Sequence, residues 1–245
     1  MPDTLLLTLL IFAAALLYSS VGHAGASGYL AAMALFNLAP DVMKPTALVL
    51  NLVVATVGTI RFARAGHFAW NIFWPFAVTS IPCALLGGYL KLPIQSYKII
   101  LGCVLLFAAW RMALAGRDVA GAPTKPLPLA PALIWGGTLG LLSGLTGVGG
   151  GIFLSPLLLL TRWADVRKTA GVAVVFILVN SVSGLLGHLA SVRNLPHEII
   201  WWAPAALVGG LIGAELGSRR LAPLMMRRLL AVVLIVAGVK MLASG

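Results

Sequence analysis

The chain has 245 residues, of which 60% are hydrophobic and only 9% are charged, and its mean hydropathy is +1.03. Soluble domains carry about a quarter charged residues, whereas apolar runs of about 20 residues are typical of helices that span a bilayer. The composition therefore excludes a soluble domain and predicts an all-α polytopic membrane protein. The formal net charge of +11 does not indicate nucleic-acid binding, because the basic residues lie between apolar runs, where they act as topology signals.

Apolar segments follow one another along the chain and predict its helices. The first run, Leu5 to Leu17, follows Asp3 and no basic residue, so we interpret it as part of the mature protein rather than a signal peptide. Cys83 and Cys103 lie in apolar segments without CxxC spacing and predict no disulfide, and no cofactor or metal site is expected. The expected segments cover residues 4–21, 28–39, 46–63, 69–90, 97–115, 129–146, 151–161, 169–190, 199–217 and 226–243.

One stretch interrupts this pattern near the middle of the chain. The sequence GRDVAGAPTKPLPLAP begins at Gly116, and its prolines, small residues and charges are typical of an exposed loop. We therefore expect an N-terminal half at residues 1–115, a connecting loop at 116–128 and a C-terminal half at 129–245, integrated into one membrane domain.

The two halves repeat each other in sequence. The first half reads SVGHAGASGYL where the second reads SGLTGVGGGIF, and matching residues continue in order beyond these motifs. This pattern favours a duplicated architecture of two homologous halves. The matches pair Ser20 with Ser143, Gly28 with Gly151, Thr46-Ala47 with Thr169-Ala170, Asn51 with Asn180, Gly58 with Gly187, Arg64 with Arg193, Pro75 with Pro204 and Gly88 with Gly217.

The first apolar stretch of each half is too long for one span. Leu5 to Leu38 and Leu129 to Thr161 would each be roughly 50 Å as a single helix, against a hydrocarbon core of about 30 Å. Both contain glycines, which disfavour a helix interior by roughly 1 kcal/mol relative to alanine. We therefore expect half-helices that begin after Gly28 and Gly151, in segments that either cross the membrane or return as re-entrant hairpins.

The basic residues favour the re-entrant arrangement. If both broken segments cross the membrane, ten of the 17 basic residues lie on one side and seven on the other. If both segments return to the side they entered from, twelve basic residues lie on one side and five on the other. The second division agrees better with the positive-inside rule. It gives three transmembrane helices per half, inverted repeats and both termini outside, although eight crossings remain an alternative. The twelve residues are Arg61, Arg64, Arg111, Arg117, Lys125, Arg162, Arg167, Lys168, Arg219, Arg220, Arg227 and Arg228.

The breaks predict an anion site at the membrane midplane. A helix that begins inside the membrane presents free N–H groups and partial positive charge, and glycine lets a ligand approach the backbone. The alternatives are close helix packing for the glycines and helix–helix hydrogen bonds for the asparagines. The expected binding residues are Gly22, His23, Gly25, Ser27, Gly28, Asn51, Thr146, Gly147, Gly149, Gly150, Gly151 and Asn180.

Few groups are available for proton coupling. His23 lies in the first break, His188 follows Asn180 on one helix face, and Glu215 is the one acidic residue inside a predicted span. For His188 the alternative is a hydrogen-bonded core histidine, and for Glu215 an interfacial ion pair with Arg219. The scarcity of carboxylates and histidines at depth argues against a metal transporter.

The motifs SSVGHAGASGYLAAMALF and SGLTGVGGGIFLSPLLLL, with the Thr-Ala and Asn segments that follow each, resemble the TauE/SafE family, also called the 4-toluenesulfonate uptake permease family. The resemblance covers nearly the whole chain, and Ala26-Ser27 replaces expected glycine in the first motif. It implies a multi-pass transporter of the bacterial inner membrane that carries sulfite or organosulfonates without an ATPase subunit.

We therefore expect a secondary carrier, not an enzyme, that binds a small sulfur oxyanion between two glycine-broken helices and works by alternating access. Its expected partners are the small anionic substrate and the lipid bilayer, with no nucleic acid. The alternatives are an anion channel, a transporter of another small anion, and a membrane scaffold. The sequence leaves open the direction of transport, the coupling ion and the oligomeric state.

Overall fold

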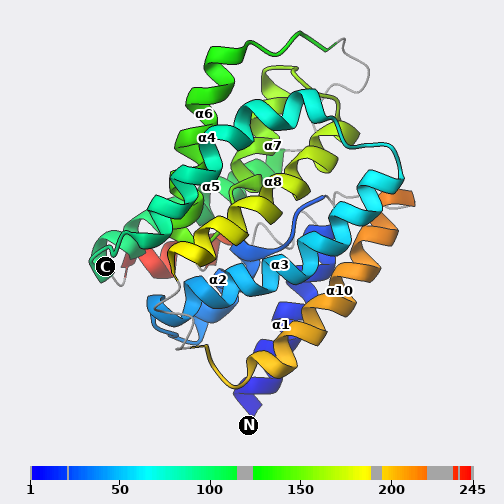
Figure 1. Cartoon of the computed structure of the whole chain (residues 1–245). Coiled ribbons are helices and arrows are strands. Elements are labelled where there is room, and N and C mark those ends of the chain that lie inside the picture. Colours follow the sequence, from blue (N-terminus) through cyan, green and yellow to red (C-terminus); the bar gives the residue numbers. More distant parts are fainter. Residues whose placement is uncertain are drawn as a thin grey trace.

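The computed structural model describes residues 2–20, 22–114, 124–188, 195–219, 234–236 and 238–243. Within these ranges the regular structure is helical, with no strand (Figure 1). Residues 116–123 of the expected connecting loop, and residues 226–233 and 237 of the last expected segment, lie outside the described part. The helices are α1 (Pro2–Ser19), α2 (Ala26–Leu35), α3 (Pro40–Arg64), α4 (Trp70–Tyr89), α5 (Ile94–Leu114), α6 (Leu129–Thr146), α7 (Gly151–Leu160), α8 (Val166–Gly187) and α10 (Ile199–Arg219).

Local chemistry explains where three of the helices begin. α3 starts at Pro40, earlier than the expected residue 46, because proline suits the first helical turn and Asp41 complements the helix dipole there. α8 starts after Asp165, whose side chain accepts a hydrogen bond from the Lys168 N–H at 2.8 Å. α2 starts at Ala26 because Gly25 adopts a left-handed conformation, so the expected start after Gly28 was wrong.

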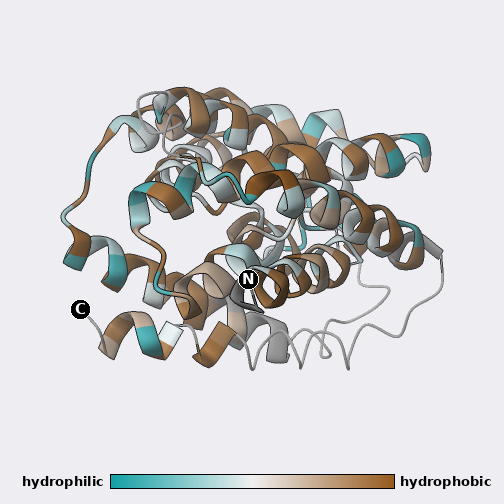
Figure 2. Cartoon of the chain, turned by 90° about the horizontal axis from the view of Figure 1, so that it is seen from below, coloured by the Kyte–Doolittle hydropathy of each residue, from teal (hydrophilic) through white to brown (hydrophobic). Residues whose placement is uncertain are grey.

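Among the described residues, five helices are long and apolar enough to cross a membrane, namely α3, α4, α6, α8 and α10. Figure 2 shows hydrophobic residues along most of the helices. In α4 the Trp70 side chain at the start is 64% exposed and the Tyr89 side chain at the end is 77% exposed. A helix of this length spans about 30 Å, and exposed aromatic residues at both ends are typical of a helix that crosses a bilayer. The protein is a multi-pass membrane protein.

Glycines let the helices of the two halves approach closely. Along the parallel pair α4 and α6, a Cβ on Gly140 would meet the backbone of Ser80, and a Cβ on Gly144 would meet the backbone of Ala84. In the parallel pair α1 and α10, Gly209 and Gly213 face Phe12 and Leu16 in the same way. Small residues at such contacts are typical of membrane helices that pack backbone to backbone.

At the centre, α3 and α8 lie side by side and run in opposite directions (Figure 1). Near one end Gly184 faces Leu48, at the middle Asn51 contacts Ser181, and toward the other end Gly58 faces Val174. Asn51 and Asn180, which the sequence repeat pairs, therefore both lie at the level where α3 and α8 cross.

The buried apolar side chains of the described residues form two clusters that do not follow the two sequence halves. The smaller cluster draws on α4, α6, α7 and α8, including Phe76, Leu139 and Phe176. The larger cluster draws mainly on α1, α2, α3, α5 and α10, and includes Trp202. Each half therefore places its α4 or α10 helix against the other half.

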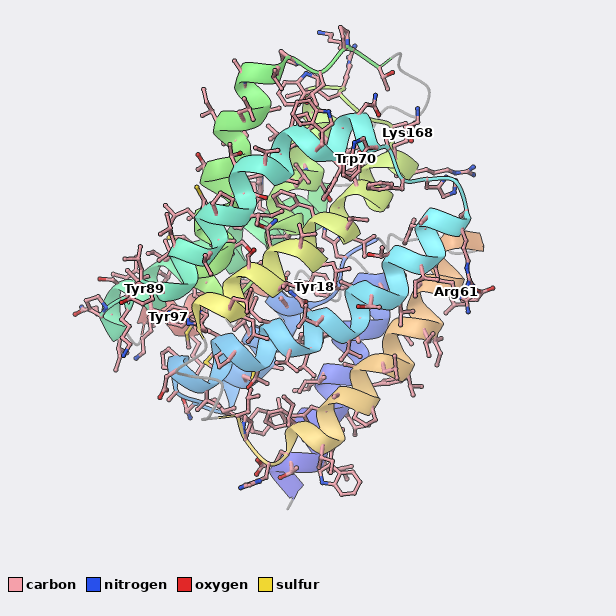
Figure 3. The ribbon with its side chains drawn as sticks, viewed as in Figure 1. Tyr18, Arg61, Trp70, Tyr89, Tyr97 and Lys168 are labelled. Atoms are coloured by element: carbon pink, nitrogen blue, oxygen red, sulfur yellow. The ribbon has the colours of Figure 1, made fainter. Side chains whose placement is uncertain are left out.

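The helix ends define two faces of the molecule. On one face the Lys125 N–H, just before α6, donates to Arg162 O, just after α7, at 2.7 Å. On the same side Arg61 near the end of α3 forms an ion pair with Glu215 of α10. Figure 3 shows Arg61, Trp70 and Lys168 toward this end of the molecule and Tyr89 and Tyr97 at the opposite end. We call the first the basic face.

The α4–α6 contact gives a test of the packing. Changing Gly140→Ala adds a methyl group against the Ser80 backbone, so we expect a loss of about 1–3 kcal/mol in stability. Gly137→Ala is the matched control, because its Cβ would lie 3.5 Å from Cys83 Sγ, an ordinary contact. Melting temperatures of the two variants in the same detergent make the comparison, and equal values would contradict the close packing.

Candidate functional site

The second glycine motif forms a sharp break between two helices. α6 ends at Thr146 and α7 begins at Gly151, while Gly147, Gly149 and Gly150 have φ values of 79°, 81° and 79°. L-residues with a Cβ rarely adopt this left-handed conformation, which explains the glycines. A side chain at Gly150 would also clash, since its Cβ would lie 2.8 Å from the Phe176 ring.

Asn51 holds this break against the α3–α8 crossing. Its Nδ2 donates to Val148 O at 3.4 Å and to Ser181 Oγ at 3.3 Å, and a Cβ on Gly149 would lie 2.6 Å from the same nitrogen. An amide nitrogen carries two hydrogens, so both are engaged. Asn51 therefore serves first to hold the broken backbone in place.

The two asparagines leave unsatisfied oxygens rather than unsatisfied nitrogens. Asn180 Nδ2 donates to Phe176 O at 2.8 Å, and the Oδ1 atoms of Asn51 and Asn180 are both buried without a partner among the described residues. Because backbone carbonyls only accept, they fix which end of each amide is the nitrogen. The crossing thus offers two acceptors, which suit water or a protonated ligand oxygen, and Asn180 retains one further N–H for a ligand.

The first glycine motif makes a second break that reaches the first residues of α7. Gly22 and Gly25 have φ values of 78° and 107°, and Gly25 precedes α2. Between them, His23 places its Nε2 3.0 Å from Ser155 Oγ and 3.3 Å from Gly151 O. The structure therefore brings together His23 of one half and Gly151 of the other, as the expected site requires.

Three further expected site residues contact their own helix or the preceding helix of the same half. Ser27 donates through Oγ to the Tyr18 hydroxyl at 2.8 Å, and Gly28 packs against Tyr18 and Ala14. Thr146 donates through Oγ1 to Leu142 O at 2.6 Å, within α6. These contacts join α2 to α1 and complete the end of α6.

Sequence reasoning missed a buried cation beside the second break. Lys44 lies in the second turn of α3 with only 6% of its surface exposed, and its Nζ lies 4.3 Å from the centre of the Tyr97 ring. A Cβ on Gly147 would lie 3.1 Å from Lys44 Cα. The predicted start of this helix at residue 46 left Lys44 outside the span, so the residue was interpreted as a topology signal.

His188, at the end of α8, belongs to the same neighbourhood. Its Nε2 lies 3.2 Å from Gly144 O near the end of α6. A buried histidine whose Nε2–H donates to a carbonyl matches the alternative of a hydrogen-bonded core residue.

Glu215 pairs with Arg61 at 3.0 Å, and both side chains are more than a third exposed. The expected partner was Arg219, whose side chain lies outside the described part. An ion pair at an exposed helix end stabilises little and keeps the carboxylate accessible to water. Glu215 is thus placed at the basic face, away from the two breaks.

A cavity of about 240 Å³ opens at the basic face. It lies between the start of α4, the segment before α6 and the start of α8, and its polar lining residues are Asn71, Thr124, Lys125 and Lys168, beside Trp163. Two lysines give it positive charge, although Lys168 also lies 3.8 Å from Asp165. The cavity is a place where anions would concentrate at the membrane surface.

Comparison with known proteins identifies the family. The family model for "Sulfite exporter TauE/SafE" matches residues 7–241. The chain belongs to this family. The family resemblance expected from the two glycine motifs is therefore confirmed, and the protein is a membrane transporter with a small-molecule substrate.

Three relatives are named as membrane transporters rather than enzymes. "Probable membrane transporter protein y4hK" of Sinorhizobium fredii is 43% identical over 96% of this chain and 97% of its own length. "Probable membrane transporter protein MJ0441" of Methanocaldococcus jannaschii is 26% identical over 83% of this chain and 80% of its own length. "Probable membrane transporter protein YunE" of Bacillus subtilis is 20% identical over 85% of this chain and 83% of its own length. No solved structure matches.

The break gives a second testable prediction. Gly149→Ala forces alanine into a left-handed conformation, at roughly 1–2 kcal/mol, and also pushes the methyl group against Asn51. Gly66→Ala is the matched control, because Gly66 has a φ of 73° with nothing within 4 Å of its Cβ position. We expect Gly149→Ala to lower the melting temperature more than Gly66→Ala does. Equal shifts would mean that Asn51 does not confine the break.

Proposed function

We propose that this TauE/SafE transporter is a secondary carrier of a small sulfur oxyanion, either sulfite or an organosulfonate, in the bacterial inner membrane. The observation that carries the proposal is the start of α7 inside the buried interior. The Phe153 and Leu154 N–H groups donate back to Gly150 O, and the N–H groups of Gly151 and Ile152 before them have no acceptor within the helix. Such a helix start binds an oxyanion through N–H groups and partial charge.

The first half supplies the rest of the proposed site. His23 lies beside the first residue of α7, and α2 begins two residues after Ala24 with its own buried N-terminal turn. An oxyanion between the two helix starts would meet backbone N–H groups from both. In this arrangement the glycines Gly22, Gly25, Gly147, Gly149 and Gly150 shape the backbone, and His23 and Asn180 contribute side-chain contacts.

We also propose that the halves are inverted repeats whose broken segments are re-entrant. The Lys125–Arg162 hydrogen bond supports this, because it joins the residues before α6 to those after α7 at one face. The antiparallel run of α3 and α8 supports the inversion. In the same arrangement Arg61, Lys125, Arg162 and Lys168 belong to the basic face, which would face the cytoplasm.

Alternating access then requires two bodies that move relative to each other. The two apolar clusters suggest that α4 moves with α6, α7 and α8, and that α10 moves with α1, α2 and α3. These bodies meet along α3 and α8, where the breaks lie. The motion therefore opens the site alternately to the two faces without separating α4 from α6.

Ligand binding by the purified protein tests the substrate class. At matched ionic strength, melting temperatures are measured with sulfite, thiosulfate, sulfoacetate, taurine, 2-hydroxyethylsulfonate and 4-toluenesulfonate, and with sulfate, chloride and nickel as comparisons. A ligand at 100 times its Kd stabilises the folded state by about 2.7 kcal/mol, so we expect a selective rise with one sulfur anion. No rise with any sulfur anion contradicts the proposal.

Flux measurements separate a carrier from an anion channel. In proteoliposomes a carrier gives saturable uptake that internal substrate accelerates, whereas a channel gives a conductance without this exchange. We expect Asn180→Leu to weaken uptake of the anion by tenfold or more while keeping its elution as a folded protein, because it removes a buried amide at the crossing. Gln95→Leu, at an exposed amide near the start of α5, is the control and should leave uptake unchanged.

A further inference from the structure

Lys44 is a buried cation that has no carboxylate partner among the described residues. The ion pairs of the described residues join Arg61 to Glu215 and Lys168 to Asp165, and neither includes Lys44. Removing an ammonium from water is costly unless a counter-charge or hydrogen-bond acceptors replace the water. The neighbours of Lys44 are instead the Tyr97 ring and the buried imidazole of His188.

The surroundings hold the ammonium next to the second break. The Tyr97 ring lies 4.3 Å from Lys44 Nζ, and the Tyr97 hydroxyl donates to Thr146 O, the last residue of α6, at 3.5 Å. The backbone of Lys44 packs directly on Gly147. Lys44 and Tyr97 therefore flank the break on the side away from the basic face, where Figure 3 shows Tyr97.

The fold does not require a lysine at this place. In the first break, Gly22 has nearly the same φ as Gly147, and it packs on Ala170 near the start of α8, much as Gly147 packs on Lys44 near the start of α3. The contact between a break and the start of the opposing central helix is therefore made in one half by alanine and in the other by lysine. The positive charge needs an explanation other than packing.

We propose that the Lys44 ammonium is the charged partner of the transported anion. This inference rests on the proposed function and adds to it a residue on the path between the break and the face opposite the basic one. The N–H groups of α7 hold the anion by hydrogen bonds, and Lys44 supplies the full charge that a helix start lacks. With the anion absent, the Tyr97 ring stabilises the ammonium.

Substitution of Lys44 tests the proposal in the full-length protein. Lys44→Met keeps the length of the side chain and removes its charge, and Lys44→Arg keeps the charge. For whichever sulfur anion stabilises the wild type, we expect Lys44→Met to raise the Kd at least tenfold and Lys44→Arg to change it less. Lys91→Met, at an exposed lysine just after α4, should leave the Kd unchanged. Size-exclusion elution shows that each variant is folded.

The outcomes separate this inference from the proposed function. If the wild type binds a sulfur anion and Lys44→Met binds it equally well, the role of Lys44 is excluded while the carrier proposal stands. If the wild type binds none of the sulfur anions, both proposals fail. A loss of binding confined to Lys44→Met supports the inference.

A second measurement distinguishes charge from volume. In a background with Cys83→Ala and Cys103→Ala, Lys44→Cys is modified either with an aminoethyl thiol reagent, which restores a positive charge, or with a methyl thiol reagent, which does not. Intact mass confirms each modification. Recovery of the wild-type Kd with the aminoethyl group alone supports the proposal, and equal recovery with both groups overturns it.

Discussion

Backbone that leaves its helix inside a bilayer must find its hydrogen-bond partners within the protein, because lipid offers none. This constraint governs the two glycine breaks, since α2 and α7 both begin in buried surroundings. The second break meets the constraint with an asparagine. Asn51 donates to Val148 O, so the side chain of one half replaces a hydrogen bond that the broken helix of the other half lost. The N–H groups of Gly151 and Ile152 have no acceptor within their own helix, and in the proposed function a ligand satisfies them.

The same constraint explains why the two halves are so closely interleaved. A break needs partners from outside its own helix, and the nearest ones come from the opposing half, as in the contacts of Asn51 with Val148 and of His23 with Ser155. The glycine contacts between α4 and α6, and between α1 and α10, bring the backbones close enough for these side chains to reach. In the proposed carrier the site is held by both halves at once, so a shift of one half relative to the other would change the site directly.

Much of the fold could be predicted from the sequence, because apolar length and glycine position act locally. A glycine run in an apolar segment predicts that one helix ends at Thr146 and the next begins at Gly151. The sequence repeat predicts that Asn51 and Asn180 lie at the same level of the fold. The start of α2 did not follow, because the first motif is degenerate and the left-handed residue is Gly25 rather than Gly28. The partners of Glu215 and Ser27 depend on how helices distant in sequence pack, which periodicity does not encode.

The burial of Lys44 could not be predicted from the sequence, because it depends on where α3 begins. A lysine before a hydrophobic run is a topology signal if the helix begins after it, and a buried charge if the helix begins before it. Pro40 and Asp41 decide between these by starting α3 a full turn ahead of Lys44. The exposed basic residues of the opposite face orient the protein and attract anions at long range, where salt screens them. A buried ammonium beside Gly147 is screened far less, so in the proposed carrier the charge of Lys44 acts more strongly on a bound anion than the charge of an exposed lysine does.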